Sequence, residues 1–152
     1  MFCSEDQTLD MPSPSSLSRL TDTARILKLT KQTGRSFHVA FILKGRKGIS
    51  LGINNFHKTN RICHTYKPTR HHLADYIARA HSEIQSTARF RDWPIRDIRK
   101  LTLVSIRINN KNQLAFAQPC PNCAYHLGKW GYDDIWFSTN EGTFDRMPKP
   151  RY

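Results

Sequence analysis

Apolar residues recur at two different periods along this 152-residue chain, and the two periods predict helices and strands. Spacings of three and four predict an amphipathic helix from residue 16 to about residue 32, with Ser15 or Ser16 as its cap. The same spacings predict a second helix from residue 73 to about residue 90. A third helix is expected over residues 121–130, because it begins with proline and a glycine follows its last residue.

Runs of β-branched and aromatic residues, bounded by turn-forming residues, predict the strands. The first two runs flank residues 45–48 and therefore predict a hairpin, whereas residues 54–72 show no period and predict a long loop. Helices alternate with strands along the chain, so we expect one α/β sheet that helices can cover on both faces. The runs expected to form strands are residues 37–44, 49–53, 101–108, 135–138 and 143–147.

Length and composition predict a single domain behind a short tail. Residues 1–15 are polar and rich in Pro and Ser, which predicts a flexible N-terminal tail, and residues 16–152 are long enough for one ordinary domain. No apolar run approaches the roughly 20 residues that a membrane span needs. The first residues are acidic where a secretory signal would be basic. We therefore expect a cytoplasmic protein without membrane association.

Positive charge is unevenly distributed along the chain. The net charge is +12, and the window from Thr23 through Ala74 holds eleven Lys and Arg residues but no Asp or Glu. Such a window is typical of proteins that bind phosphates or polyanions. A solvated basic face that serves solubility is the alternative interpretation.

Two short motifs carry side chains suited to a metal site. The first is His81-Ser82-Glu83, and the second is Pro119-Cys120-Pro121-Asn122-Cys123. Zinc prefers four tetrahedral nitrogen and sulfur ligands, and a catalytic site keeps one position for water. His81, Cys120 and Cys123 would supply three ligands, and the helix that starts after Cys120 would help to keep both thiols ionised. Glu83 would lie beside the metal without binding it, where a carboxylate can transfer protons.

Two other interpretations of the cysteines are open at this point. A structural zinc site would need a fourth protein ligand at short spacing, and His126 is the nearest candidate. A redox C-x-x-C would begin a helix in a thioredoxin-like order of elements, and it would not need His81 or Glu83. A catalytic zinc site is the hypothesis that uses both motifs.

Together the two motifs form an H-x-E and P-C-x-x-C pattern, and on this pattern the chain resembles the cytidine deaminase-like superfamily of zinc-dependent nucleobase deaminases. The likeness extends from about residue 17 to residue 147. It includes Gly52-Ile53-Asn54-Asn55-Phe56-His57-Lys58-Thr59, which is similar to a G-x-N-x-x-x-K-T stretch of small deaminases. Two departures are Ser82, where the family usually has alanine, and Asn60, where it usually has histidine.

This resemblance implies a fold and a set of site residues. The fold would be a three-layer α/β/α arrangement with a central mixed sheet of about five strands and with Zn²⁺ held between two helices. Zinc would be bound by His81, Cys120 and Cys123, and Glu83 would be the catalytic proton carrier. Asn54 would line the pocket and contact the sugar or the base. The substrate-binding residues expected are Asn54, Lys58, Ser82 and Pro119.

The function expected from these observations is hydrolytic deamination of cytosine to uracil in a phosphorylated substrate. That substrate would be a deoxycytidylate- or cytidylate-type nucleotide or a single-stranded nucleic acid. One alternative is an adenine-directed deaminase built from the same parts, and another is a non-catalytic zinc-containing module that binds nucleic acid. An intact Glu83 favours the enzyme. Many relatives of this fold form dimers or tetramers, so the resemblance also implies a homo-oligomer.

Overall fold

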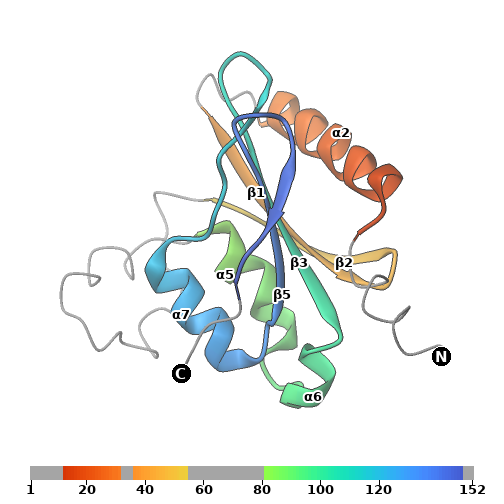
Figure 1. Ribbon diagram of the computed structural model, residues 1–152, viewed down its shortest axis with the longest axis vertical. Coiled ribbons are helices and arrows are strands. Elements are labelled where there is room, and N and C mark those ends of the chain that lie inside the picture. Colours follow the sequence, from red (N-terminus) through yellow and green to blue (C-terminus); the bar gives the residue numbers. More distant parts are fainter. Residues whose placement is uncertain (1–11, 32–35, 55–80, 149–152) are drawn as a thin grey trace.

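A mixed β-sheet lies at the centre of the computed structural model, which describes residues 12–31, 36–54 and 81–148 (Figure 1). Its strands are β1 (Phe37–Lys44), β2 (Lys47–Ile53), β3 (Leu101–Ile108), β4 (Leu114–Ala115), β5 (Asp134–Ser138) and β6 (Phe144–Arg146). Five of them follow the order β2-β1-β3-β5-β6, and β4 pairs with β3. The β3–β5 pair is parallel, whereas the other pairs are antiparallel.

The expected α/β fold with a mixed sheet is confirmed, and β1 and β3 have the predicted bounds. Both strands lie in the interior of the sheet, where β-branched and aromatic side chains pack on both faces. The sheet has six strands where about five were expected, because Leu114 and Ala115 pair with the end of β3. The bounds of β2, β5 and β6 differ from the predicted ones by one or two residues.

Successive side chains of β1 point to opposite faces of the sheet and pack against different helices. Val39 and Phe41 belong to a core shared with α2, whereas Ala40 and Ile42 belong to a core shared with η2, α6 and α7. Figure 1 accordingly shows α2 on one side of the sheet and α5 and α7 on the other. These elements are α2 (Pro14–Thr30), α5 (Ser82–Thr87), the 3₁₀ helix η2 (Ala88–Phe90), α6 (Ile95–Ile98) and α7 (Pro121–Trp130).

Helix α2 begins two residues before its predicted start. Ser13, rather than Ser15 or Ser16, is the cap, and its hydroxyl accepts a hydrogen bond from the Ser16 backbone N–H at 3.2 Å. Pro14 occupies the first turn, where the N–H that proline lacks would have no helical partner. Helix α2 therefore includes residues 14 and 15, which were assigned to the tail. Residues 1–11 of the predicted tail lie outside the described residues.

Two basic residues of the acid-free window hold α2 against the turn that follows β3. Lys28 is 8% exposed, and its Nζ donates to the Asn109 carbonyl at 2.7 Å. The Nε of Arg25 donates to the Asn112 carbonyl at 3.2 Å. Part of the charge that suggested phosphate binding therefore satisfies backbone carbonyls inside the fold.

The helix predicted over residues 73–90 does not run through His81. This residue has extended backbone angles, with φ −73° and ψ 149°, and α5 begins after it at Ser82. The end of the predicted helix is the 3₁₀ turn η2, and the short helix α6 after Pro94 was not predicted. Apolar spacing continues across His81, so spacing alone does not reveal that His81 is extended and that α5 starts at Ser82. Residues 73–80 lie outside the described residues.

Helix α7 has the predicted bounds because its end signals are local. Pro121 begins it, and Gly131 follows with φ 100°, a left-handed conformation that glycine adopts without strain from a Cβ.

In the part of the chain that the structure describes, none of the helices combines the length and the apolar character that crossing a membrane requires.

Gly52 lets α5 approach β2 closely, and this contact provides the first testable prediction. A Cβ at this position would overlap the Ser82 carbonyl oxygen and the Ser86 backbone nitrogen of α5. Because backbone atoms cannot rotate away, Gly52→Ala is expected to displace α5 and to destabilise the protein by about 3 kcal/mol. The expected fall in Tm is roughly 6–12 °C, measured by thermal unfolding.

Gly48 provides the matched control on the same strand. A Cβ there would meet only a Leu43 side-chain carbon at 3.8 Å, which is ordinary van der Waals contact. Gly48→Ala is therefore expected to change stability by no more than about 0.5 kcal/mol. Equal Tm values for the two variants would contradict the close packing of α5 on β2.

Candidate metal centre

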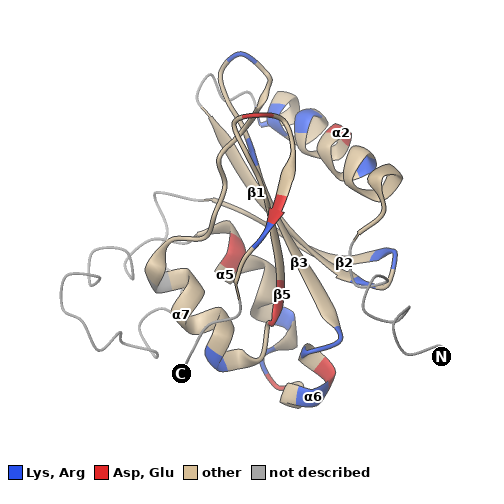
Figure 2. Cartoon of the chain, viewed as in Figure 1, with Lys and Arg blue, Asp and Glu red and all other residues tan. Residues whose placement is uncertain are grey.

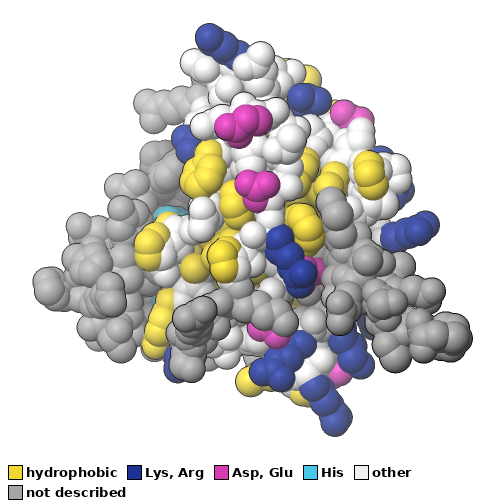
Figure 3. Space-filling view, in the orientation of Figure 1, with side chains coloured by type: hydrophobic (Ala, Val, Ile, Leu, Met, Phe, Trp, Pro, Cys, Tyr) yellow, Lys and Arg dark blue, Asp and Glu magenta, His cyan; other side chains and the backbone are white. Residues whose placement is uncertain are grey.

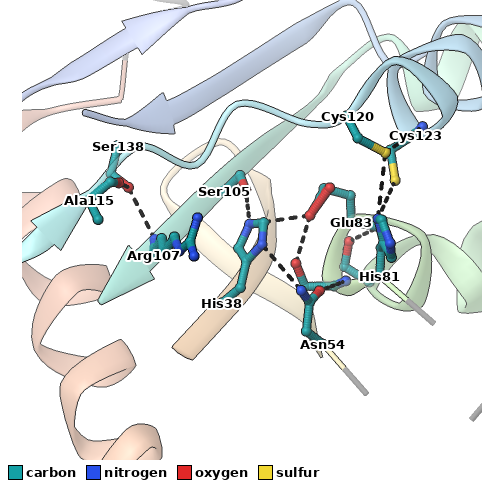
Figure 4. A network of polar contacts seen from close by, with 12 residues as sticks. His38, Asn54, His81, Glu83, Ser105, Arg107, Ala115, Cys120, Cys123 and Ser138 are labelled. Atoms are coloured by element: carbon teal, nitrogen blue, oxygen red, sulfur yellow. Dashed lines mark hydrogen bonds and ion pairs between the residues drawn. The ribbon is translucent and has the colours of Figure 1, made fainter. Parts of the chain in front are cut away.

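The two sequence motifs meet where two helices begin (Figure 4). His81 immediately precedes α5, Cys120 immediately precedes α7, and Cys123 lies in the first turn of α7. Cys123 and Ile84 of α5 are both buried in one small cluster that joins the two helices. The fold thus brings His81 together with Cys120 and Cys123, which follow it in the chain by 39 and 42 positions.

The three side chains have the mutual distances of ligands to one zinc ion. The Nδ1 atom of His81 lies 3.1 Å from the Sγ of Cys123 and 3.6 Å from the Sγ of Cys120, and all three atoms lie within 4.8 Å of one another. Zinc–ligand bonds of about 2.0–2.3 Å at tetrahedral angles separate ligand atoms by about 3.5 Å. One imidazole nitrogen and two sulfurs are also a donor set that zinc favours. The residues present therefore fit a zinc ion.

The surroundings of Cys120 favour its thiolate form. The pKa of Cys120 is lowered from 9.0 to about 5, and the largest cause is a hydrogen bond from the Cys123 side chain. Burial opposes this change, whereas the His81 imidazole and the Cys123 backbone N–H contribute to it. That backbone nitrogen lies 3.4 Å from the Cys120 sulfur at the helix start. The Cys120 thiol is therefore largely ionised at neutral pH, which is the form that binds a metal.

His126, the fourth ligand considered for a structural zinc site, is not part of this group. Its buried ring stacks on Trp130 with the ring centroids 5.7 Å apart, and burial lowers the pKa of His126. Within the described residues, the group offers one histidine and two cysteines. Three protein ligands are the pattern of a catalytic zinc site, in which a fourth position takes water or substrate.

Glu83 lies in α5 beside this group, and its side chain is almost completely buried, with 1% exposed. One carboxylate oxygen, Oε1, accepts a hydrogen bond from the Ser82 hydroxyl at 2.7 Å. The same oxygen lies 3.2 Å from Nε2 of His38. Two neighbours thus hold the carboxylate in a defined orientation, two residues along the chain from His81. A carboxylate held in this way can accept and return protons without itself being a ligand.

Two residues of the site were not predicted from the sequence, His38 on β1 and Ser105 on β3. The Nε2 atom of His38 lies 2.6 Å from the Ser105 hydroxyl oxygen (Figure 4). Both residues lie among apolar neighbours on the face that α5 covers, and a buried polar residue needs a partner. That signal was present in the sequence, but the pairing of the strands was not. Burial is the main cause that lowers the pKa of His38, while the nearby Glu83 opposes it.

Three of the four predicted substrate-binding residues lie close to the metal-ligand group. Asn54 follows β2, and its Oδ1 accepts a hydrogen bond from the Ser82 backbone N–H. The Ser82 side chain is fully buried, and Pro119, which directly precedes the Cys120 ligand, is also buried. Lys58, the fourth predicted substrate-binding residue, lies outside the described residues.

Positive charge on the described surface is divided among several elements. Figure 2 shows Lys and Arg residues on α2, on α6 and at the turn between β1 and β2, where Lys44, Arg46 and Lys47 are exposed. On the face seen in Figure 3, Lys and Arg side chains gather around α6, whereas hydrophobic side chains occupy the middle. These groups contribute to the net charge of +12, and a net positive charge attracts anions over long distances.

No family model, no curated protein and no solved structure matches this chain.

Proposed function

We propose that this protein is a zinc-dependent hydrolytic deaminase that converts cytosine to uracil in a phosphorylated substrate. The observation that carries the proposal is the group of His81, Cys120 and Cys123 together with the buried carboxylate of Glu83, two residues along the chain from His81. This combination of three nitrogen and sulfur ligands with a neighbouring non-ligand carboxylate is the arrangement that base deamination by zinc requires. Neither a redox dithiol nor a four-ligand structural site needs the carboxylate.

In the proposed reaction, water replaces the exocyclic amine of the base, and ammonia leaves. A bound zinc ion would supply a water molecule whose pKa is lowered towards neutrality. Glu83 accepts a proton from this water as the new carbon–oxygen bond forms at C4, and it delivers the proton to the ring nitrogen next to that carbon. Glu83 then transfers the second proton of the water to the amine as the carbon–nitrogen bond breaks. Both protons of the water are thus accounted for in the carbonyl product and ammonia.

The phosphorylated nature of the substrate is inferred from charge. The acid-free window from Thr23 through Ala74 begins in α2, includes β1 and β2, and continues beyond Asn54 of the site. Lys28 and Arg25 are engaged with backbone carbonyls, so the charge at the turn between β1 and β2 is a more accessible part of this window. A phosphate or a polyanion is the partner that such a surface attracts.

A substrate panel tests the proposed function. Zinc-loaded protein is incubated with cytosine and adenine as free bases, nucleosides, mononucleotides, single strands and duplexes, and products are identified by mass spectrometry together with ammonia release. We expect conversion of cytosine to uracil in a mononucleotide or a single strand, with little conversion of the bare nucleoside. Binding to a strand would weaken steeply with salt, whereas binding of one phosphate would weaken only slightly.

The same panel has outcomes that contradict the proposal. Conversion of adenine alone would reassign the base while retaining the reaction. If the protein binds one equivalent of zinc but releases no ammonia from any substrate, the enzyme proposal is wrong. The alternative is then a zinc-containing module that binds nucleic acid without catalysis.

A further inference from the structure

A series of polar contacts connects the start of α5 to the Glu83 carboxylate through Asn54 and His38 (Figure 4). It begins at Ser82, whose backbone N–H points at Oδ1 of Asn54. A backbone N–H can only donate a hydrogen bond, so the atom that faces it must be the amide oxygen. The NH₂ group of Asn54 therefore faces the other way, towards His38.

This amide selects one tautomer of His38. The Nδ2 atom of Asn54 lies 3.5 Å from Nδ1 of His38, and because an amide NH₂ group only donates, Nδ1 must accept. A neutral imidazole with an accepting Nδ1 carries its proton on Nε2. Burial lowers the pKa of His38, which favours the neutral ring, and this effect outweighs the opposing effect of the Glu83 carboxylate.

The proton on Nε2 faces the site. Nε2 lies 2.6 Å from the Ser105 hydroxyl oxygen, which accepts its proton, and 3.2 Å from Oε1 of Glu83, where the positive end of the N–H attracts the carboxylate. The other neutral tautomer would turn the lone pair of Nε2 towards the carboxylate and an N–H towards the NH₂ group of Asn54. Both of these contacts would be repulsive, and the first tautomer avoids both.

The contacts of Glu83 distinguish its two oxygens. The Ser82 hydroxyl and His38 both contact Oε1, at 2.7 and 3.2 Å. Among the described residues, both of these contacts of the carboxylate fall on the same oxygen. Donors on Oε1 fix the plane of the carboxylate and draw negative charge to that oxygen, so Oε2 is the oxygen that can exchange protons with water and substrate.

We propose that Asn54 and His38 are positioning residues for Glu83: Asn54 selects the Nε2–H tautomer of His38, and His38 together with Ser82 holds Oε1 so that Oε2 does the proton transfer. This inference rests on the proposed deaminase function. It also changes the role expected for Asn54, since both ends of its amide are engaged within the protein. Asn54 acts on the reaction through His38.

Asn54→Asp tests this role with almost no change of shape. One carboxylate oxygen can still accept from the Ser82 N–H, but the other now accepts where Nδ2 donated, and it therefore favours a proton on Nδ1 of His38. The ring protonation of His38 is measured by two-dimensional ¹H–¹⁵N NMR on the zinc-loaded, ¹⁵N-histidine-labelled full chain, and the His38 signals are assigned by their loss in His38→Gln. We expect Nε2–H in the wild type and protonated Nδ1 in Asn54→Asp.

Kinetics then separate positioning from substrate contact. Asn54→Asp and His38→Leu are expected to lower kcat about 10- to 100-fold with KM and zinc content nearly unchanged. His38→Gln, whose amide NH₂ can replace the Nε2–H donor, should recover much of the kcat lost in His38→Leu. Glu141→Gln, an exposed change in the turn between β5 and β6, is the control and should behave as wild type.

The outcomes distinguish this inference from the proposed function. A wild-type His38 that is protonated on Nδ1 alone would overturn the inference even if the protein deaminates cytosine. An unchanged kcat in Asn54→Asp with a shifted tautomer, or a raised KM with unchanged kcat, would overturn it as well. A wild type that is inert on every substrate refutes the deaminase and the positioning role together, and the substrate panel reveals that case independently of the spectrum.

Discussion

Replacing Glu83 by Gln is expected to lower the turnover of the best substrate by up to about 10⁴-fold while leaving the bound zinc unchanged. The side chain is buried and its Oε1 accepts from the Ser82 hydroxyl, and a glutamine amide can keep the shape and this one contact. It cannot take up a proton from water and return it. Because the same carboxylate serves more than one proton transfer in the proposed reaction, its loss is expected to have the largest effect of any single substitution that preserves the fold.

The measurement is single-turnover ammonia release at equal zinc occupancy, with Glu141→Gln as the matched control. Glu141 is an exposed carboxylate in the turn between β5 and β6, outside the site, and its loss changes the net charge by the same amount. Turnover within tenfold of wild type in Glu83→Gln would show that another group carries the protons. A fall in zinc content would instead mean that Glu83 is a ligand.

Replacing Cys123 by Ser is expected to abolish stoichiometric zinc binding. The Cys123 sulfur is 1% exposed and lies 3.1 Å from Nδ1 of His81, so the substitution removes one of three ligand atoms at the centre of the group. It also removes the side-chain hydrogen bond that contributes most to the lowered pKa of Cys120. We expect zinc content, measured by elemental analysis, to fall from about one equivalent to less than about a tenth.

Loss of the metal should also be visible in stability. Zinc at about 100 times its Kd stabilises a protein that binds it only when folded by about 2.7 kcal/mol. The wild-type Tm is therefore expected to fall on treatment with a chelator, whereas the Tm of Cys123→Ser should not respond to zinc or chelator. Cys123→Ser that still binds one equivalent of zinc would contradict the ligand assignment.

His126→Gln is the control for Cys123→Ser. His126 lies in the same helix and stacks on Trp130, but it is not part of the ligand group. Zinc content should therefore stay at one equivalent in this variant. If zinc content falls as far as in Cys123→Ser, the site has the four protein ligands of a structural centre, and the catalytic proposal loses its basis.

Local signals determined the elements that were predicted with correct bounds. β1 and β3 are runs of β-branched and aromatic residues that pack on both faces of a sheet, and α7 has proline at its start and glycine after its end. The prediction failed where a longer-range contact decides the backbone. His81 interrupts an apolar spacing that continues on both sides of it, and α5 starts at Ser82, whose N–H is satisfied by Asn54 from another element.

The residues that can bind a metal were recognisable in the sequence, because ligand chemistry depends on residue type and on short spacings such as C-x-x-C. The way in which Glu83 is held depends on the three-dimensional fold. His38 contacts it from β1, and Ser105 of β3 and Asn54 at the end of β2 contact His38. These residues meet because β1 lies between β2 and β3 while α5 packs on β2 across Gly52. Strand order and helix docking are long-range properties that no local pattern encodes, and the orientation of the carboxylate depends on both.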